Sequence, residues 1–262
     1  MIDIGANLTD RSFDADRDRV ITSAFHAGVD TLIVTGSTVD NSEAGLRLAR
    51  LYPGRLFSTA GLHPHHGKDW SDEAENTLRS LAAEPEVVAL GECGLDFNRN
   101  LSPHEDQERC FEAQLALAAE LQLPVFLHER DAHETFLAIL ARWRDRIPRA
   151  VVHCFTGEED GLTAYLDLDL HIGITGWICD ERRGRHLREL VGRIPRGRIM
   201  IETDAPYLIP RDMRPKPKTR RNEPQWLPWV ARRVAACRGE SLEDFLTHAD
   251  AATRAFFALT AE

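Results

Sequence analysis

The sequence predicts a single TIM-type (β/α)8 barrel, and three observations support this fold class. The chain has 262 residues, close to the about 250 residues of a typical barrel. Eight short, β-rich apolar runs alternate with stretches of helical spacing, which is the pattern of repeated βαβ units. No Gly-x-Gly-x-x-Gly sequence follows the first run, which favours a closed barrel over a doubly wound open sheet. We therefore expect one barrel domain over residues 1–262.

Each predicted strand is a short run rich in Val, Ile, Leu and Ala that ends at Gly, His, Glu or another polar residue. In chain order the strands are expected at residues 2–4, 31–34, 56–60, 87–90, 124–127, 150–152, 170–174 and 199–201.

Helical spacing separates these runs and is clearest over residues 103–121. One face of this segment is apolar, and Ser102 and Pro103 are placed to cap it. The residues on that face are Phe111, Leu115, Ala118 and Ala119. After the eighth strand, residues 210–224 are basic and rich in Pro, which predicts a long loop. Two further helices are expected, at about 224–237 and 241–258.

The composition is that of a globular protein without a membrane segment. Apolar residues make up 43% of the chain and charged residues 28%, and no apolar run approaches the roughly 20 residues of a membrane span. The first residues include an acid and lack the basic start of a signal peptide, so we expect a cytoplasmic protein. Five cysteines without a Cys-x-x-Cys pair indicate reduced thiols, and Cys93 and Cys154 are expected to pack in the interior.

Positive charge is concentrated in one segment of an otherwise acidic chain. The formal net charge is −10, yet residues 211–221 hold six basic residues against the single acid Asp212, which gives +5 there and −15 elsewhere. A polyanion would therefore meet this segment, because phosphate binding depends on basic charge. Its candidate contacts are Arg211, Arg214, Lys216 and Lys218. The alternative interpretation is a solvated loop.

Acidic and imidazole side chains follow several of the predicted strands. Glu92, His128 and His153 each follow one of three consecutive strands, and Asp204 follows the last. Because barrel active sites lie at the carboxyl ends of the strands, these four residues are expected to converge. Two imidazoles and two carboxylates suit a divalent cation such as Zn²⁺, Mn²⁺ or Mg²⁺. The sequence thus predicts a metal site.

The expected chemistry is hydrolysis, with a metal ion that lowers the pKa of a water molecule. Asp204 is the candidate general base, and Glu92 is both a ligand and a catalytic group. His63 and His65, after the third strand, are candidates to donate hydrogen bonds to the reacting group. Glu202 is expected to orient a ligand from outside the site.

The loop after the seventh strand carries candidate substrate contacts. Trp177 could stack on a nucleobase, a contact worth about 1–3 kcal/mol in single-strand binders, or could be a packed residue. Arg182 and Arg183 could contact phosphates, or could begin a solvated helix.

Six stretches of the sequence resemble the TatD family of metal-dependent deoxyribonucleases. They are residues 3–8 (DIGANL), 91–100 (GECGLDFNRN), 128–133 (HERDAH), 153–157 (HCFTG), 172–184 (IGITGWICDERRG) and 201–211 (IETDAPYLIPR). The resemblance implies an amidohydrolase-like barrel in which Glu92, His128, His153 and Asp204 bind the metal. It also implies Mg²⁺ as the usual cofactor, and single-stranded DNA or RNA, degraded from 3′ to 5′, as the substrate.

The first strand departs from the wider family, which has a His-x-His pair there. In this chain the positions read Gly5-Ala6-Asn7, so two imidazoles are absent. We therefore expect one well-occupied metal position, with Asn7 beside the ligands rather than among them.

Two other functions remain open at this point. The same barrel and ligands also serve hydrolases of small amides, esters or lactones. Neutral small substrates of this kind would not need the basic segment at residues 211–221. A non-catalytic role in protein export is the third hypothesis, and a metal constellation counts against it. The nuclease hypothesis includes a role in DNA repair or nucleic-acid degradation, a monomeric state and no obligate protein partner. A recessed barrel site would favour a free single-stranded end over a duplex.

Overall fold

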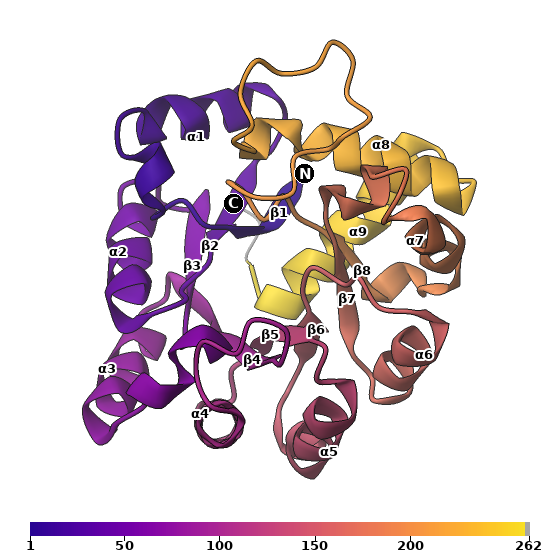
Figure 1. Ribbon diagram of the computed structural model, residues 1–262. Helices are drawn as coiled ribbons and strands as arrows, with labels where there is room; N and C mark the ends of the chain where they lie inside the picture. The colour runs from indigo at the N-terminus through magenta and orange to yellow at the C-terminus, as the bar shows by residue number, and fades with distance from the viewer. Residues whose placement is uncertain (260–262) are drawn as a thin grey trace. The chain divides into compact units, whose positions relative to one another are not determined.

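The computed structural model describes residues 1–259, and residues 260–262 of the expected domain lie outside the described part. One parallel sheet has the strand order β1-β2-β3-β4-β5-β6-β7-β8 (Figure 1). The strands are β1 (Ile2–Ala6), β2 (Thr31–Val34), β3 (Leu56–Ala60), β4 (Val87–Asp96), β5 (Val125–Arg130), β6 (Ala150–Val152), β7 (His171–Ile174) and β8 (Ile199–Ile201).

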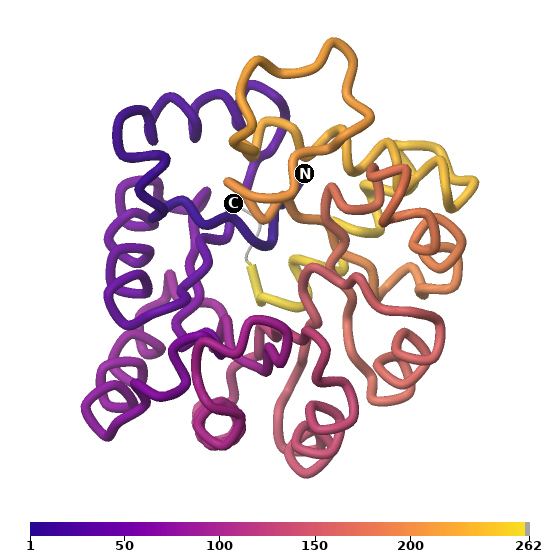
Figure 2. Tube along the Cα trace, in the orientation of Figure 1, coloured from indigo at the N-terminus to yellow at the C-terminus, as the bar shows by residue number. Residues whose placement is uncertain are grey.

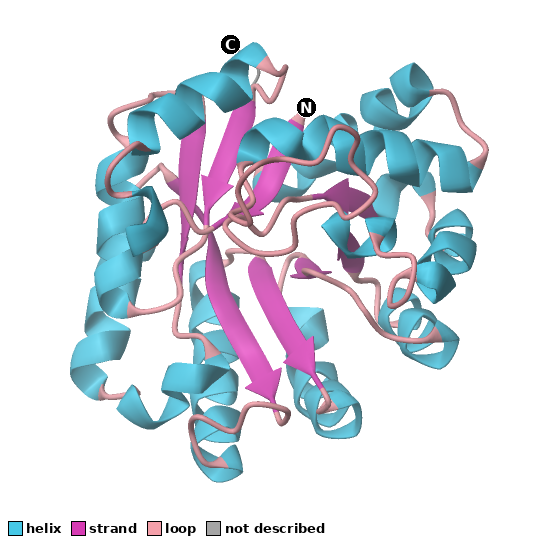
Figure 3. Cartoon of the chain, turned by 45° about the horizontal axis from the view of Figure 1, so that its top comes forward, coloured by secondary structure: helices cyan, strands magenta, loops and turns pink. Residues whose placement is uncertain are grey.

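Helices follow the strands along the chain, and Figure 3 shows them in cyan outside the magenta strands. They are α1 (Arg17–His26), α2 (Val39–Ala49), α3 (Asp72–Ala82), α4 (His104–Leu121), α5 (His133–Trp143), α6 (Glu159–Asp167), α7 (Arg185–Leu190), α8 (Leu227–Arg238) and α9 (Leu242–Phe257). No helix in the described part of the chain has the length and hydropathy of a membrane span.

The chain forms two compact units, and each has its own part of the sheet. The first unit comprises Met1–Val34, Cys154–Asp167 and His171–Glu262, and the second comprises Thr35–His153 and Leu168–Leu170. In the first unit β7 pairs with β8 and β1 with β2, and a bridge between Ala6 and Ala205 joins the first strand to the chain just after the last. In the second unit β3, β4, β5 and β6 pair in order.

The strands lie in sequence order in a parallel sheet, and the chain after the last strand pairs with the first. This topology is that of a (β/α)8 barrel, so the predicted fold class is confirmed. The strand interiors are almost wholly buried, which explains why the sequence shows them as short continuous apolar runs.

Strand β4 continues six residues beyond its predicted end at Leu90 because two glycines let it stay close to β5. At Gly91 (φ +130°) an added Cβ would lie 2.2 Å from Phe126 O, and at Gly94 (φ +145°) 1.9 Å from His128 O. Only glycine tolerates such close backbone approach at positive φ. Pairing therefore runs on to Asp96, opposite Arg130.

The predicted cap of the 103–121 helix is wrong in part. Pro103 is the N-cap of α4, but no side chain caps the helix. The Ser102 hydroxyl instead donates to His65 O at 2.8 Å and accepts from Lys68 N at 3.2 Å. Ser102 thus fixes the loop after β3, where two candidate site residues lie.

The predicted long loop before α8 is confirmed, and Figure 2 shows it as the wide orange loop near α8. A short 3₁₀ turn, Pro224–Trp226, then leads into α8. No disulfide joins the five cysteines, all of which lie in the described part of the chain. Cys93 is fully buried, as expected for a packing residue, whereas Cys154 is partly exposed.

Candidate metal centre

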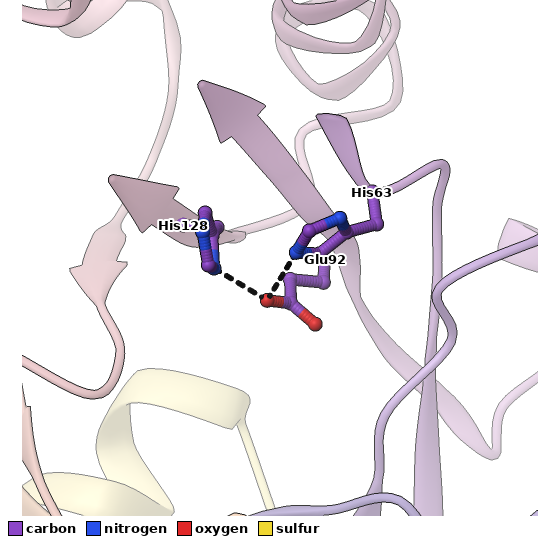
Figure 4. Close-up of side chains that lie close together, drawn as sticks. All are labelled: His63, Glu92 and His128. Atoms are coloured by element: carbon purple, nitrogen blue, oxygen red, sulfur yellow. Dashed lines mark hydrogen bonds and ion pairs between the residues drawn. The ribbon is translucent and has the colours of Figure 1, made fainter. Parts of the chain in front are cut away.

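Three imidazoles surround one carboxylate oxygen in the second unit. Glu92 Oε1 lies 2.8 Å from His153 Nε2, 2.9 Å from His128 Nδ1 and 3.4 Å from His63 Nε2. Figure 4 shows the contacts with His63 and His128. The side chains come from β4, from β5 and from the chain just after β3 and β6, so the carboxyl ends of neighbouring strands bring them together.

The backbone around each side chain is held by buried hydrogen bonds. The Glu92 N–H donates to Gly36 O at 2.7 Å, and the His63 N–H donates to Ser37 O at 3.0 Å. Gln114 of α4 pairs with both backbone groups of Leu62, accepting from its N–H and donating to its carbonyl, each at 2.9 Å. The backbone at Glu92, His63 and Leu62 is therefore fixed by hydrogen bonds.

Charge in this cluster is governed by burial and by mutual contacts. Burial acts to raise the pKa of Glu92, but His153, His63 and the hydrogen bonds from His128 and His153 hold it well below its usual value. Burial lowers the pKa of His63 to about 4, against the attraction of Glu92. At neutral pH Glu92 is therefore an anion and His63 is a neutral imidazole. The His63 Nδ1 accepts from the His65 N–H at 3.0 Å, so Nε2 carries the proton and faces Glu92.

This set of donors fits a divalent metal ion. Ligand atoms of His63, Glu92 and His128 all lie within 4.8 Å of one another. Buried carboxylate oxygen and imidazole nitrogen together are ligands of Zn²⁺, Mn²⁺ and related ions. Three of the predicted site residues, Glu92, His128 and His153, are thus brought together. His63, which the sequence predicts as a contact to the substrate, lies in the same cluster.

Asp204 lies in the first unit, just after β8, and Asn7 holds it. The Asn7 amide Nδ2 donates to Asp204 Oδ1 at 2.9 Å, and the Asp204 N–H donates to Gly5 O at 2.8 Å. Asn7 therefore contacts a predicted ligand. That Asp204 completes the metal site stays a prediction.

Glu202 is fully buried in the same unit. Its Oε1 accepts a hydrogen bond from the Cys154 N–H at 2.5 Å, so Glu202 fixes the backbone next to His153. That Glu202 orients a ligand without binding the metal stays a prediction.

Asp96 is a site residue to which the sequence analysis gave no role. Its Oδ2 lies 2.8 Å from His65 Nε2 and 3.5 Å from His128 Nε2. One signal was available, because Glu92, Gly94 and Asp96 alternate along an extended strand and therefore share a face. This alternation predicts a shared face only if β4 is known to continue past Leu90.

The candidate substrate residues of the first unit lie in two loops that contact each other. Trp177 lies in a 3₁₀ turn, Gly176–Cys179, and the Arg183 guanidinium carbon stands 5.6 Å from the centre of its ring. The backbone N–H groups of Arg182 and Arg183 donate to Asp180 Oδ1, and the Asp180 Oδ2 accepts from Arg211 at 3.3 Å.

The basic segment is anchored on both sides of its centre. Asp212 accepts from Trp229 Nε1 at 2.7 Å and from Arg233 Nε at 3.0 Å. Arg221 donates to both carboxylate oxygens of Asp16, at 2.9 and 2.8 Å, and to Glu223. Its positive charge is thereby neutralised. Between these anchors lie Arg214, Lys216 and Lys218, and all three are exposed.

Comparisons with known proteins show the family to which the chain belongs. A family model described as TatD related DNase matches residues 2–258. The chain is 56% identical to the 3′-5′ ssDNA/RNA exonuclease TatD of Pantoea vagans over 259 residues, covering 99% of this chain and 100% of that protein. It is 53% identical to the protein of the same name from Salmonella typhimurium over 257 residues, covering 98% of each. The crystal structure of YJJV, a TatD homolog from Escherichia coli, matches with a TM-score of 0.89 at 28% identity and covers 99% of this chain and 98% of its own.

Proposed function

Because the chain belongs to the TatD-related DNase family, we propose that it is a metal-dependent 3′-5′ exonuclease that hydrolyses phosphodiester bonds in single-stranded DNA and RNA. The observation that carries this conclusion is identity above 50% along the full length of proteins that bear this name. The imidazole cluster around Glu92 supports it, since it offers the donors that a hydrolytic metal needs.

We further propose that Glu92, His128, His153 and Asp204 hold the metal ion, with His63 beside them. When bound, the cation would supply Lewis-acid activation of water and would offset charge on the phosphoryl oxygens. The resemblance implies Mg²⁺, whereas several imidazoles around one carboxylate are the donors that Mn²⁺ and Zn²⁺ prefer. We expect one well-occupied position, because Gly5 and Asn7 supply no imidazole.

The proposed roles of the protein groups are those of proton transfer and orientation. Asp204 accepts a proton from the attacking water, and Asn7 holds its carboxylate in place through Oδ1. As the water oxygen bonds to phosphorus, the bond from phosphorus to the leaving oxygen breaks, and that oxygen takes up the proton that Asp204 accepted, directly or through water. His63 and His65 are the candidates to contact the phosphate or the leaving oxygen. Since His65 Nε2 is engaged by Asp96, its contact would use Nδ1.

We propose that the nucleic acid follows the two contacting loops of the first unit. The ion pair between Arg211 and Asp180 joins the basic segment to the turn that carries Trp177. A base stacked on Trp177 would then have its phosphates near Arg182, Arg183 and the basic segment, whose candidates are Arg211, Arg214, Lys216 and Lys218.

The wider proposal concerns the setting of the enzyme. We propose that residues 1–262 act as one hydrolase domain, as a cytoplasmic monomer without an obligate protein partner, in DNA repair or nucleic-acid degradation. Size-exclusion chromatography with light scattering would test the monomer, and a dimer at micromolar concentration would contradict it.

The test of function compares linear and circular single strands of one sequence, with Mg²⁺ or Mn²⁺ present and with a chelator. We expect metal-dependent release of nucleotides from the linear strand, a block by a 3′-terminal cap and no block by a 5′ cap. Efficient cutting of the circle would contradict an exonuclease, and digestion stopped only by the 5′ cap would reverse the polarity. A protein that leaves every strand intact with each metal would contradict the nuclease proposal.

A further inference from the structure

The imidazole of His128 is held between two carboxylates of the same strand. Glu92 Oε1 faces its Nδ1 at 2.9 Å, and Asp96 Oδ2 faces its Nε2 at 3.5 Å. Gly94 lies between the two acids and is opposite His128 in the register of β4 and β5. Because a side chain at Gly94 would collide with His128 O, this glycine permits the close approach.

The Nε2 atom of His128 is buried and makes no hydrogen bond within the described part of the chain. A separation of 3.5 Å is longer than an ordinary hydrogen bond, so Asp96 faces this nitrogen without closing on it. A buried N–H that lacks an acceptor is destabilising, by roughly 1–3 kcal/mol, and the Asp96 carboxylate is placed to remove that penalty.

The Asp96 carboxylate is fixed so that one oxygen serves the histidines. Its Oδ1 accepts from the backbone N–H groups of Asn98 and Arg99, at 3.0 and 2.8 Å. Gln107 holds both backbone groups of Asp96, at 2.8 and 3.1 Å. The other carboxylate oxygen of Asp96, Oδ2, is therefore turned toward His65 and His128.

We propose that Asp96 is a positioning residue that accepts the Nε2 proton of His128 and so presents Nδ1, on the Glu92 side, as the metal-binding nitrogen. A neutral imidazole carries one proton, so an acceptor at Nε2 leaves the Nδ1 lone pair for a ligand. Through the same oxygen Asp96 orients His65, and one carboxylate sets the direction of two imidazoles. Metal-binding histidines commonly pair their second nitrogen with a carboxylate in this manner. The proposal rests on the metal site proposed above but not on the nuclease activity.

The test replaces Asp96 by Asn and measures the binding of Zn²⁺, a diamagnetic probe, by calorimetry. The Asn Oδ1 must still accept from Asn98 and Arg99, so its NH₂ would occupy the place of Oδ2 and point a donor at His128 Nε2. That arrangement favours the proton on Nδ1, where it competes with the metal. We expect Zn²⁺ affinity to fall by about 10- to 100-fold in D96N.

The matched control removes a carboxylate that contacts a different histidine. Glu240 accepts from His248 Nε2 at 2.7 Å in the first unit, outside the proposed site. E240Q should bind Zn²⁺ as the unaltered protein does. Equal affinity in D96N and the unaltered protein would overturn the proposal.

A second measurement decides the question even where D96N fails to fold. Long-range ¹H–¹⁵N NMR of the unaltered protein, labelled at histidine, reports which ring nitrogen of His128 carries the proton. We expect the proton on Nε2 when Zn²⁺ is bound, because the metal then takes the place of the Nδ1 proton. Zn²⁺ bound through Nε2 would overturn the assignment.

Discussion

Asp3 of β1 is a fully buried acid whose contacts only partly offset its burial. Burial raises the pKa of Asp3 to about 7, although the side chain accepts hydrogen bonds from the Thr203 hydroxyl, the Thr203 N–H at 2.9 Å and the Gly5 N–H at 3.2 Å. In the unfolded chain an Asp titrates near about 3.9. The folded protein therefore keeps a proton that the unfolded chain has lost.

This difference predicts that stability falls as the pH rises between about 4 and 7. The contribution of Asp3 is complete below the unfolded pKa and is lost as the pH passes through the folded pKa, with a total of up to about 4 kcal/mol. Asp3→Asn removes the titrating group. Urea unfolding at pH 5 and pH 8 should show a larger loss of free energy in the unaltered protein than in D3N. Equal losses in the two proteins would contradict the assigned pKa.

The sequence predicted the strand-end residues better than the contacts among them. Glu92, His128 and His153 follow from counting strands, because each lies at the carboxyl end of a parallel strand. The closeness of His63 to Glu92 and the role of Asp96 did not follow. They depend on how far β4 runs beside β5, which is decided by backbone distances at Gly91 and Gly94 that no periodicity reveals.

At the scale of the elements, the turn that carries Trp177 packs against the loop after β8. An added Cβ at Gly176 would lie 2.2 Å from Leu208 O and 3.2 Å from Pro210 Cγ. A collision with backbone cannot be relieved by a side-chain rotation, so the two loops must separate.

We therefore expect Gly176→Ala to weaken single-strand binding and to lower the free energy of unfolding by about 1–3 kcal/mol. Gly192→Ala is the matched control, since nothing in the described structure lies within 4 Å of a Cβ added there. Binding of a fluorescent oligonucleotide and thermal unfolding would be measured for both variants. Unchanged binding in G176A would indicate that Trp177 does not contact the substrate.

The basic segment predicts how strongly the affinity for single-stranded nucleic acid depends on salt concentration. Each single-strand phosphate contact contributes a slope of about 0.7 to the plot of log affinity against log salt. A triple change to Gln should therefore lower this slope by about 2 and weaken binding, if all three side chains contact phosphates. The residues changed are Arg214, Lys216 and Lys218.

The control for this experiment removes the same charge elsewhere. Three exposed arginines, each in an ion pair with a nearby acid, are suitable for change to Gln, and they are Arg47, Arg109 and Arg193. This control should retain the slope of the unaltered protein. An equal slope in both triple variants would leave the basic segment as a solvated loop.

At the scale of the whole molecule, the strand order was predictable because each βαβ unit repeats the same alternation. The strands Thr31–Val34, Leu56–Ala60, Ala150–Val152 and Ile199–Ile201 have the predicted bounds, since polar residues or glycine end each apolar run. The division into two compact units was not predicted. It reflects contacts between residues far apart in sequence, which local patterns do not encode.

Metal binding should also be visible as stability of the entire fold. A cation that binds only the folded protein stabilises it by about 2.7 kcal/mol at a concentration 100 times its dissociation constant. We expect added Mn²⁺ to raise Tm, a chelator to reverse the rise, and Glu92→Gln to abolish it. Calorimetry should give a stoichiometry near one. A rise of equal size in E92Q would place the metal elsewhere.

The anchors of the basic segment bear on how the protein can be altered. Asp212 is tied to α8 through Trp229 and Arg233, and Arg221 is tied to Asp16 near the start of α1. The chain between these two ties enters and leaves at fixed points. Because Met213 is buried in the core, a replacement peptide is best limited to residues 214–220, where it would keep both attachment points and present another recognition sequence on the barrel.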